Sequence, residues 1–162
     1  MELMTWLTES LLGKLTFTTL VSMVPVIELR GGIPFGVALG LAHWQAFFAA
    51  IVANLIPVPF IVIYIRRILL WMRRHLPALD KLVDRLERKA HLKGRKVTKY
   101  KYLGLMILVA IPLPGTGGWT GALVAAFLDM PLRRALPAIA LGVLIAGFLV
   151  MGITYGFTSI FV

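Results

Sequence analysis

An uncharged apolar run from Ala135 to Phe157 restricts how this chain can fold more than any other feature of its sequence. A helix needs about 20 predominantly apolar residues to cross the hydrocarbon core of a bilayer, and this run is long enough. The run from Trp44 to Ile65 is long enough too, with Gln45 and Asn54 as its polar interruptions. Because 59% of the 162 residues are hydrophobic, a soluble domain of this size has too little interior to bury them. The sequence therefore predicts an all-α integral membrane protein.

Two further apolar stretches, residues 15–42 and 102–128, are each interrupted at their centre. Residues 28–32 read Glu-Leu-Arg-Gly-Gly, and residues 112–118 read Pro-Leu-Pro-Gly-Thr-Gly-Gly. Glycine and proline disfavour a continuous helix, and each arm is too short to cross a bilayer core alone. Irregular backbone at membrane depth is tolerated where protein or a wet cavity satisfies its polar groups. Each stretch is therefore predicted to form a re-entrant helical hairpin.

The net positive charge lies in one segment. Thirteen Lys and Arg lie between Arg66 and Lys101 against three acids, so this segment carries the whole formal net charge of +10 (13 − 3). Membrane segments flank it on both sides, and loops rich in Lys and Arg stay in the cytoplasm. The segment is therefore interpreted as a cytoplasmic loop, with no nucleic-acid partner expected.

This basic segment has a helical pattern of its own. Pro77 suits the first turn of a helix. Apolar residues then recur at helical spacing, at Leu79, Val83, Leu86 and Ala90. The pattern predicts a basic amphipathic helix that lies on the anionic inner leaflet or on a partner helix.

A shift of 86 residues superposes the two halves of the chain, since it brings the glycine pair at 31–32 onto the pair at 117–118. Each half then consists of a hairpin, a short polar link and a spanning helix. With residues 66–101 in the cytoplasm, the first hairpin enters from outside, the second from the cytoplasm, and both termini lie outside. The sequence thus predicts two inverted repeats, a design common among transporters. The alternative, one spanning helix over residues 103–128, stays open at this point.

The predicted organisation is a single membrane domain over residues 1–162. Its parts are an N-terminal segment at 1–14, the first hairpin at 15–42, a transmembrane helix at 44–65, the basic linker at 66–101, the second hairpin at 102–128 and a transmembrane helix at 131–157. Pairs of small residues, such as Gly152 and Gly156, permit close helix packing within one copy or in a homodimer.

Glu28 and Arg30 are the ionisable residues at the first hairpin turn. A charge at membrane depth is costly, and such residues commonly serve function. Glu28 can take up and release a proton, and Arg30 can hold an anionic group such as phosphate through its planar fork. The structural alternative is an ion pair that pins the turn or caps exposed helix ends. The neighbouring Gly31 and Gly32 belong to the same candidate site.

The second turn offers backbone and hydroxyl groups instead of charge. Glycine-rich backbone can present N–H groups to an anion, although the same glycines and prolines are also what a turn needs. In the first span, Asn54 can reach toward the first hairpin or act as polar glue between helices. The second turn and Asn54 complete the candidate substrate- or ion-binding set with Pro112, Pro114, Gly115, Thr116, Gly117, Gly118, Trp119 and Thr120.

No catalytic or metal-binding pattern is present in the sequence. The chain has no cysteine, and His43, His75 and His91 share no ligand spacing. There is no P-loop and no nucleophile elbow. The sequence therefore predicts no metal, no cofactor and no enzymatic activity.

Three motifs resemble one known family. Residues 28–34 read Glu-Leu-Arg-Gly-Gly-Ile-Pro, which resembles the Glu-Leu-Arg-Gly-x-Ile-Pro signature of the small multi-drug export protein family. Residues 53–59 (Ala-Asn-Leu-Ile-Pro-Val-Pro) and 110–122 (Ala-Ile-Pro-Leu-Pro-Gly-Thr-Gly-Gly-Trp-Thr-Gly-Ala) are similar to its second and third motifs. The similarity extends from about Val21 to Val150.

The resemblance implies distant kinship with the DedA, or VTT, membrane proteins. That kinship implies paired re-entrant hairpins and a proton-coupled or scrambling transport role, with lipid-phosphate carriers among the substrates. The DedA pattern places acidic residues in the first hairpin and arginines in the second. Glu28 fits this pattern, but the second turn has no arginine, and Arg30 lies in the first hairpin instead.

The leading hypothesis is a secondary transporter or lipid-carrier flippase in the plasma membrane of a prokaryote. Its substrate is small, or anionic and lipid-like, such as a polyprenyl phosphate, and binds between the two hairpin tips. The alternative, from a different class, is a non-transporting scaffold in the bilayer that docks a partner through the basic helix.

Overall fold

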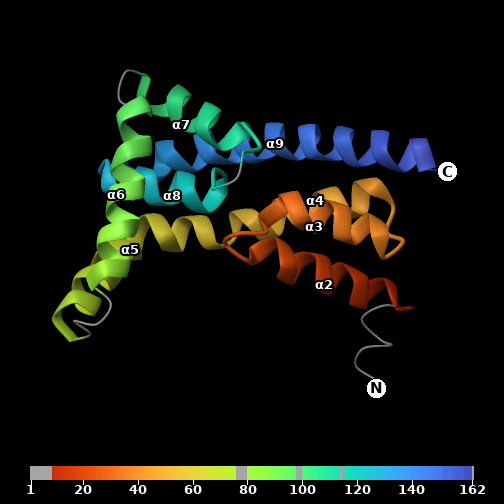
Figure 1. Cartoon of the computed structure of the whole chain (residues 1–162), viewed down its shortest axis with the longest axis horizontal. Coiled ribbons are helices and arrows are strands. Elements are labelled where there is room, and N and C mark those ends of the chain that lie inside the picture. Colours follow the sequence, from red (N-terminus) through yellow and green to blue (C-terminus); the bar gives the residue numbers. More distant parts are fainter. Residues whose placement is uncertain (1–8, 76–79, 98–99, 114, 162) are drawn as a thin grey trace.

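The computed structural model describes residues 9–75, 80–97, 100–113 and 115–161, and within these ranges the regular structure is helical (Figure 1). The helices are α2 (Leu11–Met23), α3 (Glu28–Ala38), α4 (His43–Leu55), α5 (Pro57–His75), α6 (Asp80–Val97), α7 (Lys101–Ala110), α8 (Gly118–Phe127) and α9 (Leu132–Phe161). The prediction of an all-α fold is confirmed.

Two long apolar helices form the frame of the molecule. One candidate span runs from His43 to Trp71 through α4 and α5, and the other runs from Leu132 to Gly156 in α9. The first is interrupted at Ile56, and α5 begins at Pro57, as expected because proline suits a first helical turn. Both predicted spanning helices are confirmed as long apolar helices. The first extends beyond the predicted end at Ile65, so the start of the basic linker continues α5.

Two helical hairpins, α2 with α3 and α7 with α8, pack against these long helices, the first on α4 and the second on α9 and α5. Their turns approach each other near the middle of the long axis of the molecule (Figure 1). The alternative of one helix over residues 103–128 is wrong, because α7 ends at Ala110 and α8 begins only at Gly118. The proline and glycine residues between them account for this break.

The first hairpin closes through small residues. A Cβ on Gly32 would lie 1.8 Å from Ser22 Oγ, and one on Gly36 would lie 2.8 Å from Thr18 Oγ1. Both hydroxyls donate to backbone carbonyls of their own helix, Ser22 to Thr18 and Thr18 to Lys14. With the hydroxyls satisfied in this way, the polar face of α2 can be buried against the glycine face of α3.

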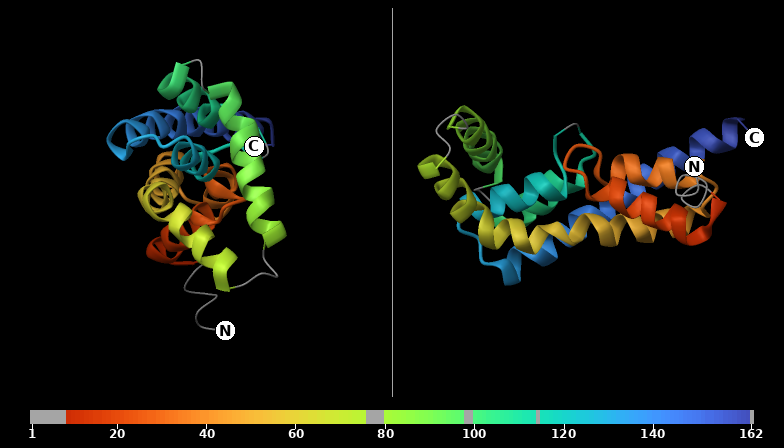
Figure 2. Two further views of the ribbon diagram at one scale, coloured as in Figure 1. Left: turned by 90° about the vertical axis from the view of Figure 1, so that its left-hand side faces the viewer. Right: turned by 90° about the horizontal axis from the view of Figure 1, so that it is seen from below.

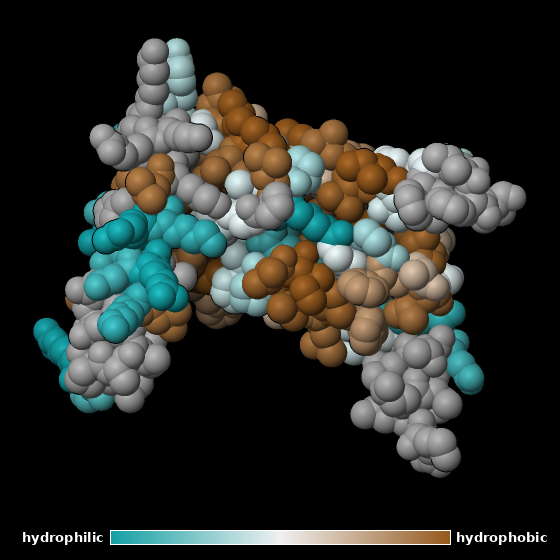
Figure 3. All heavy atoms as spheres, in the orientation of Figure 1, coloured by the Kyte–Doolittle hydropathy of each residue, from teal (hydrophilic) through white to brown (hydrophobic). Residues whose placement is uncertain are grey.

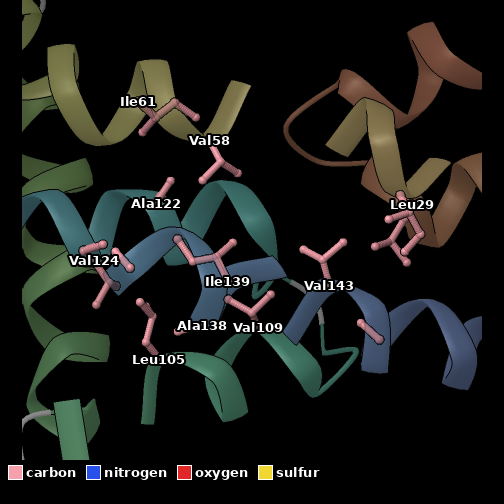
Figure 4. Packing of buried hydrophobic residues seen from close by; sticks show 14 of the residues in the cluster. Leu29, Val58, Ile61, Leu105, Val109, Ala122, Val124, Ala138, Ile139 and Val143 are labelled. Atoms are coloured by element: carbon pink, nitrogen blue, oxygen red, sulfur yellow. The ribbon is translucent and has the colours of Figure 1, made fainter. Parts of the chain in front are cut away.

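The buried core lies where α9 passes α7, α8 and α5. Figure 4 shows one layer of it, with Val58 of α5, Ala122 of α8, Val109 of α7 and Ile139 of α9, all fully buried. A Cβ on Gly142 would lie 2.7 Å from the carbonyl oxygen of Met106, so α7 and α9 touch backbone to backbone. Close contact of this kind holds helices together where lipid removes the hydrophobic driving force between them.

The outer surface is largely apolar. Figure 3 shows hydrophobic side chains over much of the visible face, the largest group of hydrophilic ones at the end formed by α5 and α6, and smaller hydrophilic groups near the centre and at the lower right. Large apolar side chains such as Phe148 and Ile153 remain 65% and 68% exposed. An exposed apolar surface of this extent indicates an interface with lipid or protein.

The basic amphipathic helix is present as α6. It crosses one end of the molecule rather than extending along it (Figure 2), packs on α7 and α8, and buries Val83 completely. Pro77 and Leu79 lie outside the described residues, as do the side chains of Leu86 and Ala90. The helix therefore lies on the second hairpin of its own chain.

Candidate functional site

Glu28 begins α3 in an unusual backbone conformation. Its φ is +51°, in the left-handed region that a side chain with a Cβ seldom adopts, and such residues cost on the order of 1–3 kcal/mol each. The residue is nevertheless buried, with 2% of its surface exposed. This conformation accompanies a side chain that reaches out of its own hairpin to the second one.

The Glu28 carboxylate lies at the N-terminus of α8. Its Oε1 accepts a hydrogen bond from the backbone N–H of Trp119 at 3.2 Å, and its Oε2 accepts one from Nη1 of Arg30 at 3.0 Å. The N-cap residue of α8 is Gly117, which has no side chain to serve as a cap. A carboxylate at this place satisfies a free N–H and interacts favourably with the positive end of the helix.

Gly117 makes room for this carboxylate. A Cβ at this position would lie 1.9 Å from Glu28 Oε2, closer than any non-bonded contact allows. The φ of Gly117 is +135°, a conformation that favours glycine. Both the space and the backbone conformation therefore require glycine at this turn.

Arg30 binds the other side of the same turn. Its Nη1 donates to the carbonyl oxygen of Thr116, and its Nη2 donates to the carbonyl oxygen of Ile111 at 3.3 Å and to Thr116 Oγ1 at 3.1 Å. Ile111 is the C-cap residue of α7, where carbonyl groups lack partners within the helix. The ion pair of the first hairpin thus covers both broken helix ends of the second.

The hydroxyls of the second turn are occupied within the turn. Thr116 Oγ1 lies 2.7 Å from the carbonyl oxygen of Ile111 and 2.8 Å from that of Leu113, and Thr120 Oγ1 lies 3.0 Å from that of Gly115. Gly115 and Leu113 are exposed and Pro112 is half-buried, while Pro114 lies outside the described residues. These contacts agree with the structural interpretation of the turn, and a ligand role for its hydroxyls stays a prediction.

Asn54 is fully buried, and neither polar atom of its side chain has a hydrogen-bond partner in the described part of the chain. A Cβ on Gly118 would lie 2.7 Å from Asn54 Oδ1, so the amide lies against the first residue of α8. Two more nitrogens, Arg30 Nε and Trp119 Nε1, are buried without a partner there. An unpaired buried polar group costs about 1–3 kcal/mol, so the four unpaired atoms of these three residues require an explanation.

The structure separates the candidate residues into two groups. Glu28, Arg30, Asn54 and the residues from Thr116 to Trp119 come together. Gly31 and Gly32 do not join them, because the first faces Ile27 and the second faces Ser22 of its own hairpin.

Sequence reasoning missed Ile111. The residue takes part through its backbone carbonyl oxygen, to which side-chain chemistry gives no clue. Its place as the last residue before Pro112 is the signal that could have identified it, because a helix that ends there leaves carbonyls unpaired. Elsewhere in the described residues, no three His, Asp or Glu residues gather as metal ligands would.

The chain belongs to the family described as "Putative small multi-drug export protein", whose sequence profile matches residues 28–149. The match begins at Glu28 and covers the second turn as well. No curated protein and no solved structure matches the chain. The family implies a transporter rather than an enzyme, and together with the two long apolar helices it indicates a membrane location.

Proposed function

Taking membership of this export family as the premise, we propose that the chain is a secondary transporter in the plasma membrane of a prokaryote. It moves a small or anionic lipid-like substrate, such as a polyprenyl phosphate, through a site between the two hairpin tips. One observation carries the proposal. The charged pair of one hairpin binds the broken backbone of the other, halfway along two helices long enough to cross a bilayer.

The position of the site along the spans supports this function. A Cβ on Gly118 would lie 3.5 Å from Val143, which is 11 residues after Leu132 (143 − 132) and 13 before Gly156 (156 − 143). At about 1.5 Å per residue, these separations correspond to roughly 16 and 20 Å. The hydrocarbon core of a bilayer is about 30 Å thick. The contact between the tips thus falls near mid-membrane, where transporters with broken helices bind their substrates.

The helix bounds support two inverted repeats with re-entrant hairpins. A shift of 86 carries α2 to 97–109, beside α7 at 101–110, and carries α3 to 114–124, beside α8 at 118–127. The same shift carries α4 and α5 to 129–161, beside α9 at 132–161. It also pairs Arg30 with Thr116, and these two residues are hydrogen-bonded to each other. Contact between equivalent residues is what a pseudo-two-fold axis between the tips produces.

The same contact is relevant to kinship with the DedA proteins. Their second hairpin carries arginine, and the second turn here carries none. Arg30 of the first hairpin supplies a guanidinium to that turn from across the axis. The chemical group that the resemblance leads one to expect at the second turn is therefore provided by the other repeat.

In the proposed transport cycle, Glu28 carries the proton and Arg30 with the second turn binds the anionic group. The basic end, where α6 lies, faces the cytoplasm, so both termini lie outside. The tip-to-tip contact closes the path, and its opening toward either side gives alternating access.

Flux through purified protein in liposomes tests the proposal. The probe is a fluorescent short-chain polyprenyl phosphate, driven by a pH gradient. Glu28→Gln is expected to abolish pH-driven flux, because the carboxyl group that carries the proton is gone. Asp84→Asn, which removes the same charge from the exposed surface of α6, is the matched control and retains flux. Unchanged flux in Glu28→Gln rules out the assignment of the proton site.

The exposed face of α6 favours a second candidate, the scaffold. Lys81, Arg85, Arg88 and Lys89 all point away from the protein, as a docking surface for an acidic partner would. Reversing the charge of Lys81, Arg85 and Arg88 separates the two functions. A transporter retains its flux in liposomes, whereas a scaffold loses its partner in the cell and has no flux to lose.

A further inference from the structure

The carboxylate of Glu28 occupies the place that a bound anion would take. It lies between the N-terminus of α8 and the guanidinium of Arg30, two features that proteins use to hold oxyanions. It is supplied from another hairpin by a residue with unfavourable backbone torsion. An ordinary helix cap is a local side chain at the N-cap position. This carboxylate instead resembles a bound anion that is covalently attached to the chain.

The residues around the Glu28 carboxylate carry N–H donors that the carboxylate does not bind. Asn54 Nδ2, Trp119 Nε1 and Arg30 Nε are all N–H donors, buried and without a partner in the described part of the chain. Glu28 has two oxygens, whereas a phosphate or sulfate ester offers three that are free to accept. These three unpaired donors stand against one unpaired acceptor, Asn54 Oδ1. The surplus of donors favours an oxyanion over a metal cation, which requires oxygen ligands.

We propose, resting on the site of the proposed function, that Glu28 is a tethered competitor for an oxyanion of the phosphate-ester class. The oxyanion takes the N–H of Trp119 and the guanidinium of Arg30 only when Glu28 is protonated and released. Asn54 and the indole N–H of Trp119 then complete its donor set. Binding of the anion and uptake of a proton are one linked event.

Charge balance supplies the reason for the linkage. Glu28 and Arg30 together are neutral, so an entering anion adds negative charge near mid-membrane, where an uncompensated charge is very costly. A proton from solvent that binds the Glu28 carboxylate restores the balance. No bond other than that O–H forms, and the hydrogen bonds to Trp119 and Arg30 pass from the carboxyl group to the anion.

The surroundings of Glu28 are poor in other titratable groups. Residues 111–127, which comprise the second turn and α8, contain none, and α4 has only His43 at its first residue. In α2 the ionisable side chain is Lys14, which lies near Gly40 at the other end of the hairpin. In α9 they are Arg133 and Arg134 near its start and Tyr155 near its end. Proton uptake at the site is therefore assigned to Glu28.

Calorimetric titration of the detergent-solubilised full chain tests the linkage. The probe is 4-nitrophenyl sulfate, whose single negative charge does not change between about pH 6 and 8, so any proton exchanged belongs to the protein. Titration in two buffers of different ionisation enthalpy measures the number of protons bound per anion. One proton is expected per anion, and the affinity is expected to rise by up to about tenfold for each pH unit lowered.

Glu28→Gln is expected to bind the probe with no proton uptake and no pH dependence, while Asp84→Asn behaves as the native chain. Zero proton uptake by the native chain, or absence of binding by the probe, overturns the inference. If Glu28→Gln fails to fold, the titration of the native chain decides alone. Inorganic sulfate and a short-chain phosphatidic acid form two further arms. Tighter binding of the lipid identifies a headgroup as the ligand, and equal binding identifies a free oxyanion.

The outcome is separable from that of the flux experiment. If proton uptake is linked to anion binding but no flux is seen in liposomes, transport is refuted and the inference that Glu28 competes with the oxyanion stands. If pH drives flux but the binding titration shows no linked proton uptake, the inference that Glu28 competes with the oxyanion is refuted and transport stands.

Discussion

The two hairpins share a shape but divide the chemistry between them. The first contributes ionisable side chains, Glu28 and Arg30, from a hairpin closed by glycine against hydroxyl. The second contributes open backbone, with helix ends at Ile111 and Gly117 that the first hairpin covers. Neither tip satisfies its polar groups alone. The side chains of the first tip bind backbone groups of the second, and the backbone groups of the second are bound by those side chains. Two hairpins of similar shape can thus be chemically unequal.

Substitution of Gly117 by alanine breaks this complementarity most severely. The added Cβ collides with Glu28 Oε2 and forces an unfavourable φ. We expect a loss of about 3 kcal/mol in stability, from backbone strain and overpacking together, and loss of pH-driven flux. Thermal unfolding in detergent and liposome flux measure the two effects.

Gly152→Ala is the control for this substitution, because a Cβ there meets nothing within 4 Å. It should leave flux unchanged and should not lower stability, because alanine is favoured over glycine within a helix. Unaltered stability and flux in Gly117→Ala would mean that the Glu28 carboxylate does not lie at this turn.

Replacing Asn54 by leucine sharpens the comparison, because this residue of the long helix α4 lies against the second hairpin at Gly118. Removal of an unpaired buried amide should stabilise the chain by about 1–2 kcal/mol. At the same time, affinity for an oxyanion should fall several-fold, because a donor is lost. Thermal unfolding and calorimetric titration measure these opposite changes.

Thr154→Val is the matched control, because its buried hydroxyl already donates to the carbonyl oxygen of Val150 at 2.8 Å. Little or no gain in stability is expected from it. If Asn54→Leu destabilises the chain instead, the amide has a partner in the native protein and is no free donor.

The smallest effect is expected at a second ion pair, Arg66 with Asp129, which unlike the pair of Glu28 and Arg30 joins the two halves of the chain. Its side chains are 51% and 75% exposed, against 19% and 3% for Arg30 and Glu28. Exposed pairs contribute about 0–1 kcal/mol and weaken in salt. Asp129→Asn should therefore lower the melting temperature slightly at low ionic strength and not at high. A loss that persists in high salt would show that Asp129 acts through more than this pair.

Much of the fold could be predicted from the sequence. Hydropathy and length predicted both spans, and the Gly/Pro breaks predicted two helical pairs in place of two further spans. Charge pattern and helical spacing predicted α6. Glu28, Arg30 and the second turn were also grouped as one site from residue type alone, although their ligand role stays a prediction.

The contacts themselves could not be predicted. Asn54 was expected either to reach toward the first hairpin or to act as polar glue between helices, and it lies against Gly118 of the second hairpin. Asp129 pairs with Arg66, 63 residues away in the sequence. The direction of a side chain depends on how helices far apart in the sequence cross, and no local pattern encodes that crossing.

By itself, the sequence determined which segments are helical, where they break and which residues carry charge, because hydropathy, glycine and proline act locally. Only the tertiary structure decided that Glu28 caps α8 and that Arg30 covers the end of α7. The physical reason is that the broken ends of α7 and α8 have a polar requirement that their own hairpin meets only in part. That requirement is satisfied only when the two tips pack together.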